Sequence, residues 1–448
     1  MSIPRLPAHF RLLPLLLAVG AGFSASAQAQ SLVDLYASAR SYDATYQSAK
    51  SQFDATLAKR DQAKALILPK AGLALSYTRT NYESKSIPAS AVDREFGTQS
   101  GTVSASQPLY RPADWASYEQ GLKQADLAQA QLLAAEQDLV IRVGQAYFDV
   151  LASTDNLAFV KSQKAAVAEQ LASAKRNFEV GTSTITDSRE AQARYDLVIA
   201  QELAAENDLQ VKSIALDQLV GKQNAKPSPL ATPVVLAELK PAQVDHWVRQ
   251  SETNHPGIKQ LEVALDVAKL ETQKAVAGHK PTLDLVGSYA ASTNNGSTQS
   301  PLNTGSNVAS IGLSLNIPLF AGFSTQNRIK ETLALEDKAR TDLEATKRTV
   351  AQGTRTAYFG VLSGLGQVRA YEAAEASSQS ALDATKLGYQ VGVRINIDVL
   401  NSQSLLFDTK AKLAKARYDV LLGGLKLRQA AGTLQTDDLQ PINALLAQ

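Results

Sequence analysis

Two segments of the sequence repeat each other about 210 residues apart. Residues 178–187 contain an aromatic residue, a Val-Gly pair, β-branched residues and a final Asp, and residues 389–398 repeat that order. Three further landmarks return at nearly the same offset, namely 69–77 as 281–289, 108–110 as 318–320 and 146–151 as 357–362. Landmarks that keep their order and spacing predict a duplicated unit, and the period is too long for a solenoid repeat.

The composition argues against several classes of protein. The chain has 448 residues, a net charge of +2 and no cysteine. Disulfides, thiolate metal sites and cysteine nucleophiles are therefore excluded, and the balanced charge gives no reason to expect nucleic acid. His246, His255 and His279 lack the spacing of a metal site. We expect no enzyme and no cofactor.

The beginning of the chain has the pattern of a secretory signal. Arg5 and Arg11 are followed by an apolar run, and Ala27 and Ala29 fit a small-residue cleavage site. The pattern predicts a signal peptide over 1–29 and a mature chain that starts at Gln30. No later run of about 18 apolar residues predicts a transmembrane helix, so membrane insertion would have to use strands.

Helical periodicity covers most of the chain. Apolar residues, many of them alanine, recur every three or four positions over four long segments, at about 112–179, 187–220, 324–390 and 398–431. This pattern predicts long helices with coiled-coil packing. Shorter helices are predicted at 31–66, 241–252 and 257–276. The resulting organisation is repeat 1 at 30–221, a connector at 222–255, repeat 2 at 256–432, and a partly extended tail at 433–448.

Between the helices, the period changes to two. Four segments alternate apolar residues with small polar ones, at about 71–80, 101–107, 282–290 and 308–317. Each predicts a strand with one apolar and one polar face. The polar stretches 81–100 and 290–307 predict loops.

Such strands fit either a helix-covered sheet or a membrane barrel. The helices have apolar seams of their own, which favours the barrel. Four strands cannot close one, and open edges are not tolerated in lipid, so several chains would have to share it. Two chains would supply eight strands and three would supply twelve. Tyr110, Trp115, Phe320 and Phe323 lie where strands give way to helices, which fits an aromatic girdle at the membrane interface or ordinary junction packing.

The sequence resembles the TolC-type outer-membrane efflux proteins over essentially its whole mature length. The motifs that carry the resemblance include Ala-Tyr-Phe-Asp-Val-Leu at 146–151, Val-Gly-Thr-Ser-Thr-Ile-Thr-Asp at 180–187 and Tyr-x-Val-Gly-x-Arg-x-x-x-Asp-Val-Leu at 389–400. The resemblance implies a mostly α fold with β: a trimeric outer-membrane β-barrel, four strands per chain, continued by a long periplasmic α-helical coiled-coil barrel. It implies a homotrimer in outer-membrane lipid that extends into the periplasm, where it docks to a periplasmic adaptor and an inner-membrane transporter.

The resemblance also implies a gate at the two repeated turns. Arg394 and Tyr389 would bind Thr186 and Asp187, and Asp398 from three chains would form an acidic, cation-favouring ring. Asn401 stands where the family often has a second Asp, so we expect a less negative constriction. The turns, Val180-Gly181 and Val391-Gly392, would dock the adaptor.

Helix capping is the competing interpretation of these residues. Asp187 followed by Glu190 has the spacing of a capping box, and Asn396 or Asp398 could cap the following helix.

The predicted function is a passive, gated exit duct of a tripartite efflux or type I secretion system. A periplasmic coiled-coil adaptor or scaffold is the alternative, which would explain the helices but not the four amphipathic strands. The sequence does not separate small-molecule efflux from protein secretion.

Overall fold

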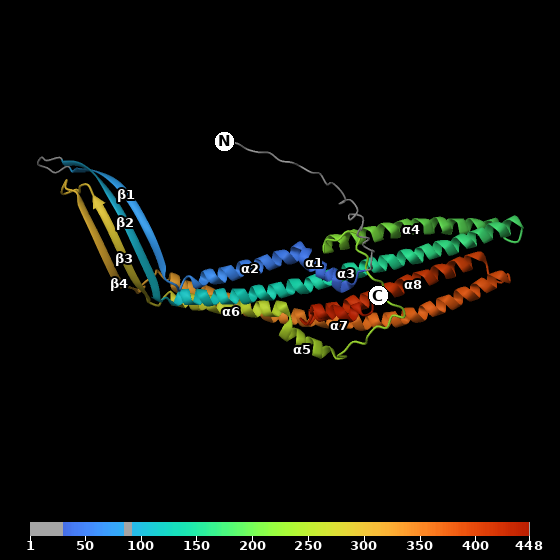
Figure 1. Ribbon diagram of the computed structural model, residues 1–448. Coiled ribbons are helices and arrows are strands. Elements are labelled where there is room, and N and C mark those ends of the chain that lie inside the picture. Colours follow the sequence, from blue (N-terminus) through green and yellow to red (C-terminus); the bar gives the residue numbers. More distant parts are fainter. Residues whose placement is uncertain (1–29, 85–91, 448) are drawn as a thin grey trace, which may run out of the picture.

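A computed structural model describes residues 30–84 and 92–447, and the predicted signal segment lies outside them. The elongated molecule has a sheet at one end and two helix tips at the other (Figure 1). The elements follow in the order α1 (Leu32–Tyr42), α2 (Ala44–Lys64), β1 (Lys70–Ser84), β2 (Val92–Tyr110), α3 (Pro112–Glu179), α4 (Ile185–Val220), α5 (Val244–Asn254), α6 (Pro256–Ala277), β3 (Thr282–Asn294), β4 (Thr304–Asn316), α7 (Ser324–Gln390), α8 (Asn396–Ala430), a 3-10 turn (Thr436–Leu439) and α9 (Gln440–Asn443).

The four strands form one antiparallel sheet in the order β1-β2-β3-β4. All four were predicted, but the predicted loops between them were too long. Backbone pairing continues to Ser84 and Val92 in the first hairpin, and to Asn294 and Thr304 in the second. The apolar alternation ends before the strands do, because their far ends carry polar residues on both faces while the backbone ladder continues.

The two faces of the sheet differ in chemistry, as predicted. On one face, Leu73, Val103 and Tyr289 lie side by side, and Leu285 pairs with Leu313. These side chains are exposed. On the other face, two rows of small residues cross all four strands, and they are Ser76-Ser100-Ser292-Ser306 and Gly72-Ser104-Ser288-Ser310. Hydroxyl oxygens within these rows lie 2.7–2.9 Å apart.

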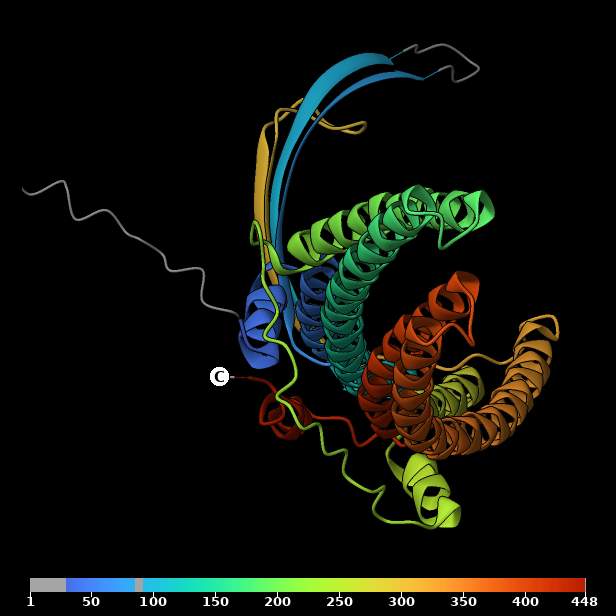
Figure 2. The same cartoon turned by 90° about the vertical axis from the view of Figure 1, so that its right-hand side faces the viewer.

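Two helices dominate the rest of the molecule. α3 has 68 residues and α7 has 67, so each is about 100 Å long. Each folds back on its successor, so that α3–α4 and α7–α8 form two hairpins. Seen from the tips, the hairpins curve along an arc (Figure 2). None of the described helices has the length and apolar character needed to cross a membrane.

The main core lies where the chain is widest, between α1, α3, α8 and the C-terminal segment. Tyr147 is fully buried there, and its hydroxyl donates to the Ser228 carbonyl oxygen at 2.8 Å. Its repeat partner Tyr358 donates to the Ala242 carbonyl oxygen at 2.5 Å. The duplicated Tyr-Phe motif therefore ties both ends of the connector to the helices. Burial raises the pKa of Tyr147.

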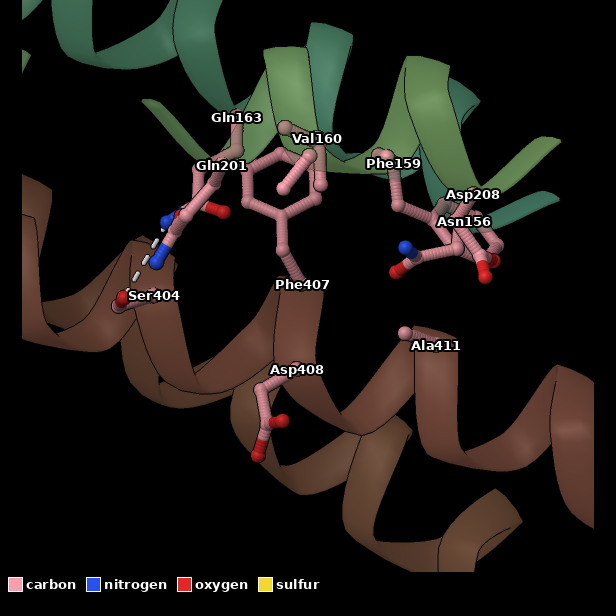
Figure 3. Close-up of a pocket in the computed structure, with 12 residues that line it drawn as sticks. Asn156, Phe159, Val160, Gln163, Gln201, Asp208, Ser404, Phe407, Asp408 and Ala411 are labelled. Atoms are coloured by element: carbon pink, nitrogen blue, oxygen red, sulfur yellow. Dashed lines mark hydrogen bonds between the residues drawn. The ribbon is translucent and has the colours of Figure 1, made fainter. Parts of the chain in front are cut away.

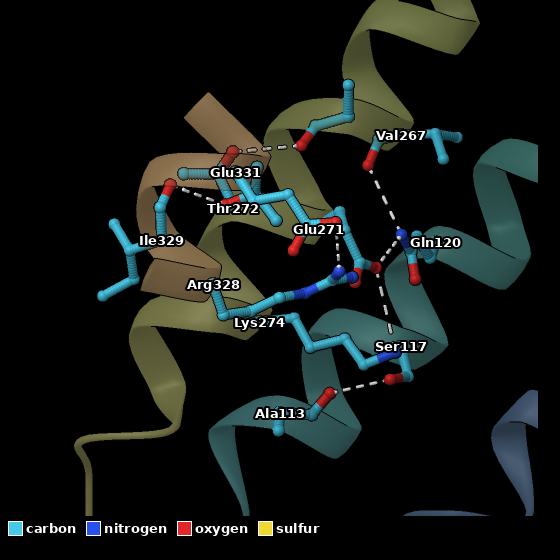
Figure 4. A network of polar contacts seen from close by, with 12 residues as sticks. Ala113, Ser117, Gln120, Val267, Glu271, Thr272, Lys274, Arg328, Ile329 and Glu331 are labelled. Atoms are coloured by element: carbon cyan, nitrogen blue, oxygen red, sulfur yellow. Dashed lines mark hydrogen bonds and ion pairs between the residues drawn. The ribbon is translucent and has the colours of Figure 1, made fainter. Parts of the chain in front are cut away.

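A polar network braces the helices next to the sheet (Figure 4). Glu271 of α6 accepts hydrogen bonds from Gln120 of α3 at 2.9 Å and from Arg328 of α7 at 2.7 Å. Both contacts favour the carboxylate, and the pKa of Glu271 is lowered. One side chain thus joins three helices.

One prediction about the beginning of the chain was wrong. The expected single helix 31–66 breaks at Asp43, which leaves the helical conformation and caps α2 by accepting from the Tyr46 amide at 2.8 Å. Arg142 holds the Asp43 carboxylate at 2.8 Å. The tail contains the 3-10 turn and α9, because Leu439 and Ile442 are buried in the core and must be turned toward it.

Candidate functional site

The two predicted turns have the same backbone conformation. Gly181 has φ of +77° and Gly392 has φ of +80°, a region that L-residues with a side chain rarely adopt. In each turn, a pair of amides converges on one carbonyl oxygen five or six residues earlier: Thr182 and Ser183 donate to Asn177, and Val393 and Arg394 donate to Gly388. The duplication is therefore preserved in backbone hydrogen bonds at the tips.

The first tip is closed by a capping box. Thr184 is the N-cap of α4, and its hydroxyl oxygen accepts from the Asp187 amide at 3.2 Å. Asp187 Oδ2 in turn accepts from the Thr184 amide at 3.0 Å and the Ser183 hydroxyl at 2.6 Å. These bonds, the Ser183 bond above all, lower the pKa of Asp187. The predicted box, with Asp187 as the cap and Glu190 three residues later, was wrong: a capping box is present, but Thr184 is the cap and Asp187 is the third residue of the helix.

The second tip has no such cap. The N-cap of α8 is Ile395, which has no side-chain acceptor, so the prediction that Asn396 or Asp398 caps this helix was wrong. Arg394 lies 3.7 Å from Asp398, and its side chain is 63% exposed. The polar side chains of this tip therefore remain available for contacts outside their own turn.

The two hairpins touch near the tips through uncharged groups and one arginine. Asn177 of α3 donates to the Tyr389 hydroxyl at 3.2 Å. Arg194 of α4 donates to the side-chain oxygen of Asn401 at 2.8 Å. Gln163 donates to Ser404 at 3.2 Å, beside an open-sided cavity of about 520 Å³ between α3, α4 and α8 (Figure 3).

The structure does not join the predicted clamp residues within one chain. Arg394 pairs with Asp398, Tyr389 with Asn177, and Thr186 is exposed. Among the described residues, all hydrogen bonds to the Asp187 carboxylate use Oδ2, and none uses Oδ1. The clamp that joins Arg394 and Tyr389 to Thr186 and Asp187 stays a prediction.

Large exposed side chains mark both ends of the apolar face of the sheet. Tyr110, Trp115, Phe320 and Phe323 are exposed at the helix end, where the edge of Trp115 meets Tyr118 and the edge of Phe320 meets Phe323. At the other end, Tyr77 and Tyr289 close the apolar runs of β1 and β3 and are also exposed. Neither tyrosine was predicted from the sequence as an interface residue, although each is the last large apolar residue on its strand's alternating face.

The polar face of the sheet has no charge over its central part. Four successive rows begin on β1 at Gly72, Ala74, Ser76 and Thr78 and cross to β4. They contain only Gly, Ala, Ser, Thr, Val and Asn. Charged side chains on this face lie nearer the ends, at Lys70, Asp284 and Arg94. Such a face can line a water-filled bore without attracting one sign of charge.

Known proteins of this architecture match the chain almost end to end. The family model described as "Outer membrane efflux protein" matches residues 35–222 and 247–433, one match in each half. Outer membrane protein TolC of Vibrio cholerae is 34% identical over 438 residues, covering 97% of this chain and 98% of the relative. Alkaline protease secretion protein AprF of Pseudomonas aeruginosa is 30% identical over 420 residues, covering 92% and 86%.

Solved structures show the same fold. The outer membrane protein VceC of Vibrio cholerae aligns with a TM-score of 0.77 at 18% identity, covering 90% of this chain and 96% of that one. The transmembrane channel protein CusC aligns with a TM-score of 0.78 at 16% identity, covering 95% and 99%. Together with the matches in both halves, this places the protein in the outer membrane as an exit duct of the efflux and type I secretion kind. The chain belongs to the outer membrane efflux protein family.

Proposed function

We propose that three copies of the chain form one duct, which crosses the outer membrane as a shared barrel and continues through the periplasm as a tube of helices. The observation that carries this proposal is the four-stranded sheet, in which an exposed apolar face is combined with two edge strands, β1 and β4, that pair on one side only within the described residues. Open edges are not tolerated in lipid. Neighbouring copies would pair β4 of one with β1 of the next.

The number of copies follows from the need for an open bore. Two chains would give an eight-stranded barrel, whose interior is about filled by side chains. Three chains of four strands each give twelve strands, which leave a channel. The uncharged polar rows of the sheet would line this channel. The exposed aromatic side chains at both ends of the apolar face would form the two aromatic girdles.

The helices also offer surfaces for neighbouring copies. α4 exposes Leu203 and Val211, and α7 exposes Phe359 and Leu362. Phe359 is the repeat partner of Phe148, which is buried inside the chain. Packing α7 of one copy against α4 of the next would cover these side chains and close the tube.

The gate would lie at the tips, where three second tips converge. Arg394 would reach from its exposed position to Asp187 Oδ1 and to Thr186 of the next copy, with Tyr389 beside it. A charge-assisted hydrogen bond contributes about 1.5–3 kcal/mol, which biases an open-closed equilibrium and leaves it switchable. Asp398 would line the constriction, where Asn401 adds no charge.

The exposed turns would dock a periplasmic adaptor that connects the duct to an inner-membrane transporter. Val180 and Val391 are 72% and 66% exposed, and Val393 beside them is 75% exposed. An apolar adaptor surface could bury them. The duct itself performs no chemistry; the transporter supplies the energy and the duct supplies a path. The exposed apolar sheet has no role in the alternative function of a periplasmic scaffold.

Planar-bilayer recording tests this function directly. The purified protein should migrate as a heat-dissociable oligomer and conduct weakly, and Arg394→Ser should raise the conductance several-fold. Arg189→Ser, at an exposed position of α4 next to the tip, is the matched control and should leave conductance unchanged. A monomeric protein that inserts no channel would contradict the proposal; a conducting trimer in which Arg394→Ser has no effect would contradict the clamp alone.

A further inference from the structure

A buried amide stands at the start of α8. Asn396 is the first residue of this helix and is 1% exposed, whereas the neighbouring Ile395 is 60% exposed. An asparagine side chain can donate two hydrogen bonds and accept two. Burying it without partners would cost free energy, so its contacts determine what it does.

The side chain of Asn396 contacts both helices of the other hairpin. Gln170 Nε2 of α3 donates to Asn396 Oδ1, and Asn396 Nδ2 donates to the backbone oxygen of Asp187 in α4 at 3.2 Å. One carboxamide therefore joins the second tip to α3 and α4 at once. The Asp187 residue that it contacts is the same residue that closes the capping box of the first tip.

We propose that Asn396 is a neutral latch that holds α8 against the α3–α4 hairpin and keeps the tip closed. The inference rests on the proposed gating at the tips, and it names a contact within each chain that acts beside the predicted clamp between chains. Because both of its partners are uncharged groups, the latch is insensitive to salt, unlike an exposed ion pair.

The packing around Asn396 explains why its release would open the seam. One turn further along α8, Leu400 is fully buried against Val167, Leu171 and Ala191 of the other hairpin. Beyond Leu400, α8 also buries a polar side chain. Gln403 is 3% exposed, and its Oε1 has no hydrogen-bond partner among residues 30–84 and 92–447.

A cavity lies beside Gln163 and Phe407, further from the tip (Figure 3). The ring of Phe407 reaches toward Val160 from α8, and both side chains line the cavity. At its tip end the seam is therefore held by Asn396 and Leu400, and behind them it runs beside a cavity, where Gln163 bonds to Ser404.

Leucine substitutions separate the latch from simple loss of packing. Asn396→Leu keeps the side-chain volume but leaves Gln170 and the Asp187 carbonyl without their partner, which should raise the ratio of open to closed channels about tenfold. The double variant Gln170→Leu/Asn396→Leu replaces two paired groups with two apolar ones and should return part of the way to the wild-type conductance.

The control is an amide that contacts only its own hairpin. Gln192 of α4 accepts from Lys175 of α3 at 3.2 Å and donates to Asp196 at 2.9 Å. Gln192→Leu should leave conductance at the wild-type value. All variants are compared as full-length oligomers in planar bilayers. Only variants whose oligomers dissociate on heating at the same temperature as the wild type are used.

Each outcome decides a separate point. If Asn396→Leu conducts like the wild type while Arg394→Ser conducts more, the latch is wrong and tip gating stands. If neither variant differs from the wild type, tip gating itself fails. The conductance ratio of Asn396→Leu to wild type should be the same at about 0.1 M and about 1 M KCl; a ratio that falls toward one in high salt would show that the latch is ionic.

Discussion

The two tips have the same backbone conformation, but their side chains make different contacts. In the first tip, Thr184 and Asp187 satisfy each other in a capping box. In the second, Ile395 occupies the position of Thr184 and Asp398 occupies the position of Asp187, so the box is missing one half. The first tip closes on itself, whereas in the second Tyr389 and Asn396 bond to the other hairpin, and Arg394 and Asp398 pair with each other.

This difference shows what divergence after duplication achieved. A gate needs one side that stays in place and one side that moves against it. The capping box stabilises the start of α4, and the uncapped start of α8 depends on Asn396 and its contacts across the seam. We therefore expect α8, and not α4, to be the moving side.

The largest effect is expected from substitutions of the two tip glycines, which test whether the backbone conformations of the tips are equivalent. Gly181→Ala and Gly392→Ala should each destabilise their own tip by about 1–2 kcal/mol, because each places a Cβ on a left-handed residue. Both glycines have open space around them, so backbone strain is the only cost. Hydrogen exchange of peptides covering each turn measures the loss. Gly353→Ala, inside α7 and also in open space, is the control; clearly unequal losses at the two tips would break the equivalence.

The next effect tests the difference in capping. Asp187→Ala should destabilise the start of α4 by about 1 kcal/mol, the usual cost of losing a cap. Asp398→Ala should leave the start of α8 nearly unchanged, since this side chain caps nothing, and should instead lower the cation preference of the channel. Hydrogen exchange and reversal potentials in a salt gradient measure the two results. Equal exchange effects from both substitutions would show that the tips do not differ in capping.

The missing half of the second box can be supplied. Ile395→Thr restores the Thr-x-x-Asp spacing of the first tip and should stabilise the start of α8 by about 0.5–1 kcal/mol. The new cap would also draw Asp398 away from Arg394. Ile395→Val, which is β-branched but has no hydroxyl, is the control. Slower exchange in both variants would mean that side-chain shape, and not capping, sets the stability of this tip.

The smallest expected effect is a loss of stability of the first tip at acidic pH. The hydrogen bonds from Ser183 and Thr184 lower the pKa of Asp187. A lowered folded-state pKa means that the stabilisation is present above the ordinary carboxyl pKa, about 3.9, and is lost as the pH falls through the folded value. Exchange at the first tip, corrected for its intrinsic pH dependence, should therefore rise below about pH 4. Asp187→Asn should remove this response, and an unchanged response in that variant would assign it to another group.

Much of the architecture could be predicted because periodicity is a local property. The repeated segments predicted two related halves, the period of 3.6 predicted the long helices, and the period of two predicted all four strands. The ends of the strands were missed because backbone pairing does not require apolar side chains. The break at Asp43 was missed because an acidic cap inside a helical pattern looks like any other exposed acid until its partners, Tyr46 and Arg142, are placed beside it.

The sequence by itself determined the duplication, the elements and the family, since these depend on residue order along one segment at a time. Only the tertiary structure decided which polar residues meet. Asp187 and Asp398 occupy equivalent places in the two repeats, yet one is closed in a capping box and the other lies beside an exposed arginine. The sequence indicated only a capping role for Asn396. Its contacts with Gln170 and Asp187 depend on how two hairpins pack, which brings together residues more than 200 positions apart.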